Sequence, residues 1–246
     1  MLPEFHFVGI DLGRDSDHSA IAISSVYKRT GATPDPYYGV RTVTHSLEVS
    51  HLEQIPKSTE YTKVMERLGD LVRHLGHQTP YGYKQPSIQV ALDAAGPGSL
   101  GAELIRKQQL SISLYPIIIT GGEESHNLKS GATSVPRKEL LHNLRVFVET
   151  GAIVFADGLR HRERLIRECS GVKASGTTVD HDDLVVAVAL WLFDEQRETF
   201  PSSLLNDAAT GQNILVLGRG GQLVEGRFGN ALGVPQLEIR CHQRAP

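Results

Sequence analysis

The chain has 246 residues, of which 40% are hydrophobic, and its formal net charge at pH 7 is −3. This composition is typical of a globular protein with one sizeable core, and the net charge excludes a general electrostatic attraction for nucleic acid. A nucleic-acid partner would have to be held by a local basic surface or through metal ions. The two cysteines, Cys169 and Cys241, lie far apart in sequence, which is typical of free thiols in a reducing compartment and argues against a structural zinc site.

The start of the chain does not resemble a signal peptide, because Glu4 and His6 interrupt it and a strand-like run follows at once. The longest apolar run, residues 184–193, is too short to span a bilayer. The sequence therefore predicts a cytoplasmic protein with no membrane partner. It also lacks the pattern G-x-x-x-x-G-K-[ST], which excludes the phosphate-binding loop of the common ATPases.

The first quarter of the chain predicts three consecutive antiparallel strands. Residues 5–10 and 20–23 are apolar runs joined by a polar turn, and residues 38–49 alternate well enough to form a third strand. Residues 30–36 are rich in Gly, Thr and Pro and are predicted to be a loop. Asp11 is expected to project from the first strand near its end.

Helices and strands then alternate. Helical spacing of apolar residues predicts a helix over residues 61–75, which Gly76 is expected to end. The elements expected after it are a strand at residues 87–92, a helix containing residues 100–105, a strand at residues 112–119, a helix over residues 136–150 and an edge strand at residues 152–155. The order strand, helix, strand implies a parallel crossover. The predicted fold class is α/β, with a mixed sheet of three antiparallel strands plus parallel strands flanked by helices.

Two regions are expected along the chain. Residues 1–198 form the folded domain, and residues 199–246 form a C-terminal extension that is partly ordered, because helical periodicity is lost and glycine becomes frequent. Short strands are predicted at residues 213–217 and 236–240 of this extension.

Four aspartates mark the ends of elements that are far apart in sequence. Asp11 and Asp93 end two apolar strands, and Asp182 and Asp183 precede an apolar helix over residues 184–192. If the first and fourth strands are neighbours in the sheet, these carboxylates converge. Like charges a few ångströms apart raise one another's pKa, so such a cluster requires compensating cations.

The composition of this cluster predicts the ions. Carboxylate oxygens without cysteine or histidine partners suit Mg²⁺ or Mn²⁺. Two such ions about 3.5–4 Å apart activate a water and stabilise the leaving oxygen of a phosphodiester. The sequence therefore predicts a two-metal-ion phosphodiester hydrolase whose catalytic and metal-binding residues are Asp11, Asp93, Asp183 and Asp182. Of Asp182 and Asp183, one is expected to bind metal directly, and Asp183 is preferred for this role. The other is expected to cap the helix or to join the site from behind the ligand.

Each of these residues also has a purely structural interpretation. The free N–H groups of a first helical turn favour any carboxylate, which alone would explain Asp182 and Asp183. Asp11 and Asp93 also fit the role of turn residues. His181 is an auxiliary candidate that is expected to position water or face solvent rather than ligate a metal. The placement of two further acids at strand ends favours a site over a helix cap.

The most basic part of the chain follows the predicted edge strand. It is either a solvated helix face, on which Glu163 and Glu168 pair with arginines, or a surface that contacts phosphates. On the second interpretation, the expected DNA-binding residues are Lys129, Arg137, Lys138, Arg160, Arg162, Arg164 and Lys173.

Three segments resemble the nuclease domain of bacteriophage terminase large subunits: Val8-Gly9-Ile10-Asp11-Leu12-Gly13-Arg14, Val90-Ala91-Leu92-Asp93 and His181-Asp182-Asp183-Leu184-Val185. The resemblance covers residues 5–196, and the last segment is its most specific part. It implies an RNase H-like fold and a metal-dependent endonuclease that cuts double-stranded viral DNA concatemers during genome packaging. It also implies partnership with a packaging ATPase and a portal, in the host cytoplasm.

One departure from the family bears on this role. Terminase large subunits carry an ATPase motor ahead of the nuclease, whereas this sequence begins at the first nuclease strand, so it is expected to be an isolated domain or a free-standing relative. The alternatives are a Holliday-junction resolvase or another structure-selective nuclease of the same fold, an actin-like ATP-binding kinase suggested by Asp11-x-Gly13, and a non-catalytic docking module.

Overall fold

The structure is a computed structural model. It describes residues 2–13, 17–34, 41–79, 81, 83–96, 98–171 and 182–192, together with the backbone of three strands between residues 216 and 242. Of residues 29–34 and 41–45 only the backbone is described.

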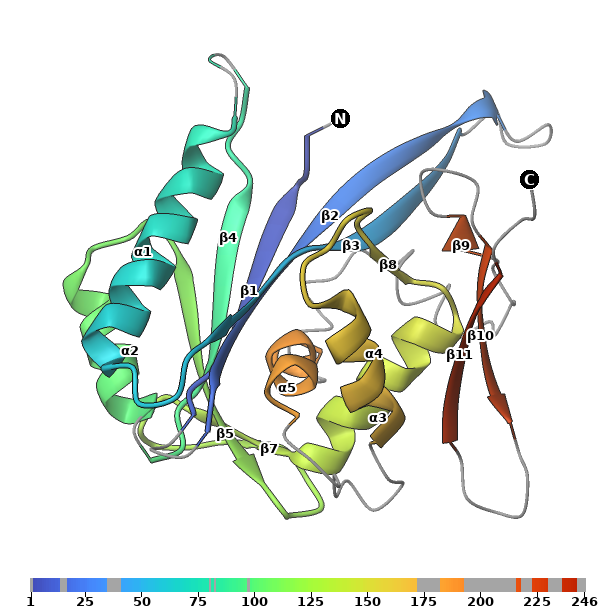
Figure 1. Cartoon of the computed structure of the whole chain (residues 1–246). Helices are drawn as coiled ribbons and strands as arrows, with labels where there is room; N and C mark the ends of the chain where they lie inside the picture. The colour runs from blue at the N-terminus through green and yellow to red at the C-terminus, as the bar shows by residue number, and fades with distance from the viewer. Residues whose placement is uncertain are drawn as a thin grey trace.

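A mixed sheet of eight strands forms the centre of the fold (Figure 1). Its strands are β1 (Phe5–Asp11), β2 (Ser19–Pro34), β3 (Arg41–Ile55), β4 (Ser87–Asp93), β5 (Ser113–Thr120), β6 (His126–Asn127), β7 (Thr133–Pro136) and β8 (Ile153–Phe155). Their order across the sheet is β6-β7-β5-β4-β1-β2-β3-β8. The predicted adjacency of the first and fourth strands is therefore confirmed, and β1 and β4 run parallel.

The directions of the strands bring six carboxyl ends to one edge of the sheet. β1, β4, β5 and β7 are parallel along one half of the sheet. β2 is antiparallel to both β1 and β3, so β3 runs in the same direction as β1, and β8 is parallel to β3. Loops beyond the carboxyl ends of strands are the usual place for ligands in open α/β sheets. This edge is called the carboxyl edge below.

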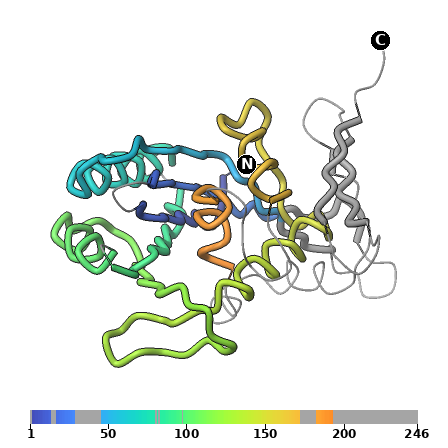
Figure 2. The backbone as a smooth tube through the Cα atoms, turned by 60° about the horizontal axis from the view of Figure 1, so that its bottom comes forward, coloured from blue at the N-terminus to red at the C-terminus, as the bar shows by residue number. Residues whose placement is uncertain are grey.

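Five helices cover the two faces of the sheet (Figure 2). On one face lie α1 (Tyr61–His77) and α2 (Gly98–Lys107), and on the other lie α3 (Arg137–Glu149), α4 (Arg162–Gly171) and α5 (Asp183–Ala189). Strand alternation supplies a separate core for each face: Val8 and Ile10 of β1 pack with α1 and α2, whereas Phe7 packs with the buried residues of α5. Every residue of α5 is buried, because the helix lies between the sheet and helices α3 and α4.

Gly9 sets how closely α5 approaches the sheet. A Cβ atom built on Gly9 would lie 1.8 Å from the backbone carbonyl oxygen of Ala187 in α5. Because that oxygen belongs to the backbone of a buried helix, it has no side-chain freedom with which to move away. A residue without a side chain at this position of β1 therefore lets the helix backbone rest directly on the strand that ends in Asp11.

Most of the predicted elements are confirmed, and two predictions are wrong. Residues 30–34 are not part of a loop, because β2 continues to Pro34 and pairs with β3 in a long hairpin. Gly76 does not end the helix, because α1 continues to His77. The short strands β6 and β7 were not predicted; their pairing with each other and with β5 is long-range information that local patterns do not carry.

A separate three-stranded sheet follows in the C-terminal part of the chain. It contains β9 (Val216–Leu217), β10 (Leu223–Gly229) and β11 (Gln236–His242) in the order β11-β10-β9, beside α3 and α4 (Figure 1). The strand predicted at residues 236–240 coincides with β11, whereas β10 was not predicted. Within the described residues, no helix has the length and apolar character that crossing a membrane requires.

Substituting Gly9→Ala should destabilise the protein by at least about 1–3 kcal/mol, because the added methyl group overlaps a backbone carbonyl. The matched control is Gly76→Ala in α1, where a Cβ meets nothing within 4 Å and the change should stabilise the helix by about 0.5–1 kcal/mol. Urea unfolding of both variants measures the two free energies of unfolding. Equal effects of the two substitutions would contradict the close contact between β1 and α5.

Candidate functional site

Asp11 and Asp93 lie side by side at the carboxyl edge. The paired residues Ile10 and Leu92 precede them on the parallel strands β1 and β4. Because side chains alternate along a strand, Asp11 shares a face with Phe7, and Asp93 shares the same face with Ala91. Both carboxylates therefore lie on the face of the sheet that α5 covers. The Asp93 carboxylate also accepts a hydrogen bond of 2.9 Å from the backbone N–H of Ala95, so Asp93 begins a turn as well.

Asp183 comes to the same place from the first turn of α5. Its side chain is buried, with 7% of the residue exposed, at the end of α5 nearest Asp11. Burial raises the pKa of Asp11 well above its usual value of 3.8, and the charges of Asp93, Asp183 and Asp17 raise the pKa further. The charge of Arg137 acts in the opposite direction and lowers the pKa of Asp11. The sequence therefore brings Asp11, Asp93 and Asp183 into one electrostatic cluster.

The cluster suits a hard cation by its chemistry, although its side chains are not yet arranged as ligands. Within the described part of the chain, no three His, Cys, Asp or Glu side chains are close enough together to hold a metal ion. Asp11, Asp93 and Asp183 are carboxylates on three different elements, and carboxylate is the donor type that Mg²⁺ and Mn²⁺ prefer. Bound cations would offset the repulsion that raises the pKa of Asp11.

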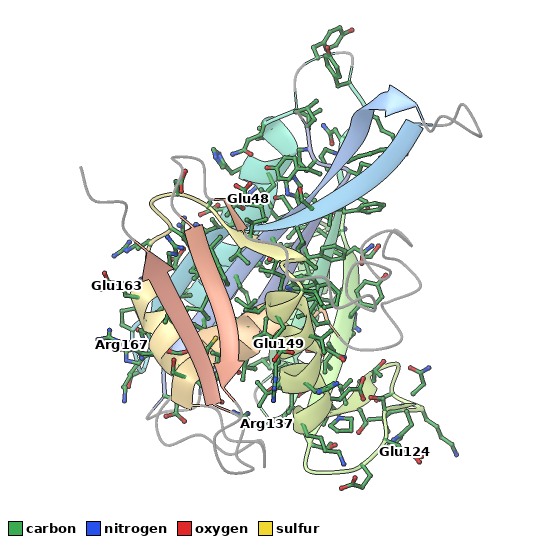
Figure 3. All side chains as sticks on the ribbon, turned by 90° about the vertical axis from the view of Figure 1, so that its right-hand side faces the viewer. Glu48, Glu124, Arg137, Glu149, Glu163 and Arg167 are labelled. Carbon is green, nitrogen blue, oxygen red and sulfur yellow. The ribbon has the colours of Figure 1, made fainter. Side chains whose placement is uncertain are left out.

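Asp182 has a different environment from its neighbour Asp183. It is the residue immediately before α5 but makes no side-chain capping hydrogen bond to the helix. Its carboxylate instead forms an ion pair with the guanidinium of Arg137, the first residue of α3. Figure 3 shows Arg137 at the start of α3. Arg137 therefore links Asp182 to the end of β7, and it is the described cation that bears on Asp11.

A chain of hydrogen bonds reaches Asp183 from the other side. Glu168 of α4 accepts hydrogen bonds from the backbone N–H groups of Leu184 (3.0 Å) and Val185 (3.2 Å) at the start of α5. Its second oxygen accepts 2.9 Å from Nε of Arg164, whose Nη1 donates 2.6 Å to Oε1 of Gln54. Gln54 on β3 in turn donates 3.5 Å from Nε2 to Oδ2 of Asp183. Residues Glu168, Arg164 and Gln54 are called the α4–β3 relay below.

Glu168 and Gln54 were not predicted as site residues, although the sequence contains a signal for Glu168. Glu168 falls within the apolar stripe of α4, three residues after Leu165, and it is buried with 8% exposed. The interpretation that placed Glu168 on a solvated face is therefore wrong. Gln54 pairs with Ala20, which pairs with Asp11, so all three lie in one row across the sheet. Burial raises the pKa of Glu168, and its contact with Arg164 opposes that rise.

The predicted DNA-binding residues are in several different environments. Lys129 and Arg160 are exposed: Lys129 lies in the β6–β7 loop at the amino end of β7, and Arg160 lies in the loop after β8, beyond the carboxyl edge. Lys138 forms an ion pair with Glu123. Arg137 and Arg164 turn toward acids, as described above, and Nε of Arg162 is buried with no hydrogen-bond partner among the described residues. By contrast, Arg167 and Glu163 lie on the outer surface of α4 (Figure 3).

Two predicted residues, His181 and Lys173, lie outside the described residues. The metal-binding and DNA-binding roles of the other predicted residues remain predictions at this point.

Comparison with known proteins identifies the fold. No profile of a protein family matches the sequence, and no curated protein matches it. Among solved structures, the chain is similar to the nuclease domain of the human cytomegalovirus terminase, soaked with manganese and with an inhibitor bound. The TM-score is 0.51 and the identity 14%, over 81% of this chain and 87% of that chain. The chain has a terminase nuclease-like fold.

A further similar structure is the large terminase nuclease from the thermophilic phage G20c with bound zinc. Its TM-score is 0.43 and its identity 19%, over 76% of this chain and 78% of that chain. The similarity to the cytomegalovirus nuclease domain confirms, for the fold, the resemblance predicted from the sequence, and the mixed sheet with helices on both faces is RNase H-like. In this terminase nuclease-like fold, Asp11, Asp93 and Asp183 occupy the carboxyl edge.

Substituting Asp11→Asn should stabilise the metal-free protein at pH 7 by about 0.5–2 kcal/mol, because it removes a buried negative charge next to two others. The folded-state pKa of Asp11 is raised, so the folded protein holds this proton more tightly than the unfolded chain, and the contribution of Asp11 to stability falls as pH rises above 3.8. The advantage of the variant should therefore shrink as pH is lowered toward 4.

Urea unfolding in the presence of a chelator, at several pH values, measures this difference. The matched control is Asp157→Asn, which alters an exposed acid after β8 and should change the free energy of unfolding by less than about 0.5 kcal/mol. A loss of stability in Asp11→Asn at pH 7 would show that the carboxylates do not repel one another.

Proposed function

We propose that this chain is a metal-dependent endonuclease that hydrolyses phosphodiester bonds of double-stranded DNA with little sequence preference. The observation that carries the proposal is the cluster of Asp11, Asp93 and Asp183, which three separate elements bring to the carboxyl edge of a terminase nuclease-like fold. Repulsion between buried carboxylates costs stability, and such a cluster is expected where its function needs it.

Asp11, Asp93 and Asp183 are the residues that would hold two divalent ions, Mg²⁺ or Mn²⁺. When bound, such ions supply an activated water and neutralise the charge that develops on the leaving oxygen. The manganese-soaked cytomegalovirus nuclease domain, which shares this fold, supports the choice of ion class. Asp182 is the auxiliary acid, because its ion pair with Arg137 fixes the chain immediately before Asp183.

Exposed cations near both ends of the sheet support a duplex substrate. Arg160 follows the carboxyl end of β8, so a duplex lying over the carboxyl edge would meet it, and Lys129 is an exposed cation of the β6–β7 loop at the other end of the sheet. The loop that carries Lys129 extends outward from the body of the protein (Figure 2). Contacts of this kind bind phosphates and carry no direct sequence information. A nuclease held on DNA by phosphate contacts is therefore expected to cleave with little sequence preference.

The biological setting that fits this proposal is the cutting of viral DNA concatemers during packaging, with a packaging ATPase and a portal as partners. The terminase nuclease-like fold supports this setting. A Holliday-junction resolvase would use the same acids and differ in substrate, so the relative rates on a four-way junction and on a linear duplex distinguish the two activities.

The purified chain should nick and linearise supercoiled plasmid in Mn²⁺ and lose this activity in excess chelator. Asp93→Asn should reduce the cleavage rate by more than about 100-fold, because a neutral amide is a poorer ligand for a hard cation. Asparagine keeps an oxygen that accepts the Ala95 N–H bond, so the turn after β4 is preserved.

The control for this substitution is Asp70→Asn, an exposed acid of α1 on the opposite face of the sheet, which should cleave at the rate of the unmodified chain. Circular dichroism verifies that both variants are folded. Undiminished cleavage by Asp93→Asn, or cleavage in excess chelator, would overturn the metal-dependent mechanism.

Lys129→Ala and Arg160→Ala should each weaken duplex binding on any sequence. Each should also reduce the slope of log affinity against log salt by about 0.9, the value for one phosphate contact. Fluorescence anisotropy at several salt concentrations measures both quantities. Lys107→Ala is the matched control, because Lys107 is an exposed cation at the end of α2 away from the carboxyl edge. If the slope of log affinity against log salt is the same for all three variants, the duplex does not contact Lys129 or Arg160.

A further inference from the structure

Three side chains that do not belong to the carboxylate cluster are connected to it through α5. We infer that the α4–β3 relay is a positioning unit, in which Glu168 fixes the start of α5 and Arg164 orients Gln54, so that together they hold Asp183 for metal binding. The inference rests on the proposed function, because it assigns these residues a role toward the same metal ions.

The first step concerns the start of α5. The first N–H groups of a helix have no partner within the helix and need one from elsewhere. Asp182 makes no side-chain capping bond, and both Leu184 N–H and Val185 N–H donate to one oxygen of Glu168. A residue of another helix therefore caps α5. The position of the Asp183 backbone depends on where α4 places that carboxylate.

The second step concerns the Asp183 side chain. An amide side chain can present either its oxygen or its nitrogen to a neighbour. Because Arg164 only donates, its bond of 2.6 Å requires the oxygen of Gln54 on its side, and the amide nitrogen is then directed to Asp183. The guanidinium of Arg164 makes this bond and the bond to Glu168 at the same time. Backbone and side chain of Asp183 are thus set by one connected unit.

The third step compares this unit with a similar ion pair elsewhere. Arg145 and Glu149 of α3 have the same spacing as Arg164 and Glu168, but both side chains are about one-third exposed. Glu168 is buried, whereas its partner Arg164 is about one-third exposed, as Arg145 is. Burying a carboxylate costs stability that its ion pair need not offset. The burial of Glu168 therefore fits a role at the start of α5 and in the orientation of Asp183, rather than a role in stabilising its own helix, α4. Residues that orient metal ligands typically change metal affinity or activity by about 10–100-fold when substituted.

The test measures Mn²⁺ binding to the full chain by electron paramagnetic resonance of free Mn²⁺, and in parallel the Mn²⁺ dependence of plasmid cleavage. Gln54→Met removes the donor to Asp183 at nearly constant volume. Arg164→Lys keeps the charge but loses the planar fork that contacts two partners. Glu168→Gln removes the charge of the cap. Each should raise the Mn²⁺ concentration for half-saturation by about 10–100-fold.

Two controls separate positioning from a general loss of structure. Glu149→Gln alters the matched ion pair of α3 and should bind Mn²⁺ as the unmodified chain does. The double variant Gln54→Met with Arg164→Lys should bind Mn²⁺ no more weakly than Gln54→Met alone, because both changes break the same connection. If Glu168→Gln fails to fold, the Gln54 and Arg164 variants, which leave the cap in place, carry the test.

The outcomes are distinct for the two proposals. Suppose that the unmodified chain binds Mn²⁺ and cleaves DNA. If Gln54→Met and Arg164→Lys then reach half-saturation at the same Mn²⁺ concentration as the unmodified chain, the positioning role is overturned and the proposed function stays intact. Additive losses in the double variant also overturn the role. An unmodified chain that neither binds Mn²⁺ nor cleaves DNA overturns the proposed function, and the positioning role with it.

Discussion

The contact between Gly9 and the backbone of Ala187 is the constraint on which the site depends. It lets a fully buried helix lie against β1 at van der Waals distance, two residues before the strand ends in Asp11. Because α5 has only seven residues, its depth on the sheet also fixes where its first residue, Asp183, is held. A longer side chain on β1 would lift the helix, and with it the carboxylate, away from the carboxyl edge.

This close packing produces a site whose charges are only partly compensated. Burial and neighbouring acids raise the pKa of Asp11, while Arg137 supplies an opposing charge from the start of α3. Arg137 is also paired with Asp182, so its charge is shared between two acids. The partial compensation leaves a favourable interaction for incoming cations.

The sequence was sufficient to predict the fold class and three of the acids at the carboxyl edge, because strand ends and helix starts are local features. Asp11, Asp93 and Asp183 each follow or precede an apolar run that can be recognised without a partner. The parts that were not predicted depend on contacts between distant segments. Gln54 is one polar residue among several near the end of β3, and only its row with Ala20 and Asp11 distinguishes it. The inward direction of Arg164 likewise depends on the position of α4 relative to β3.

The environments of Asp182 and Asp183 explain how two adjacent acids can have different roles. The two side chains leave the start of α5 in different directions, one toward Arg137 on α3 and the other toward Gln54 on β3. Asp182 forms an ion pair with a full positive charge, whereas Asp183 accepts a long hydrogen bond from a neutral amide. A cation that bound Asp182 would have to displace or share its ion pair with Arg137. Under the proposed function, this ion pair makes Asp182 the auxiliary acid and leaves Asp183 as the preferred ligand.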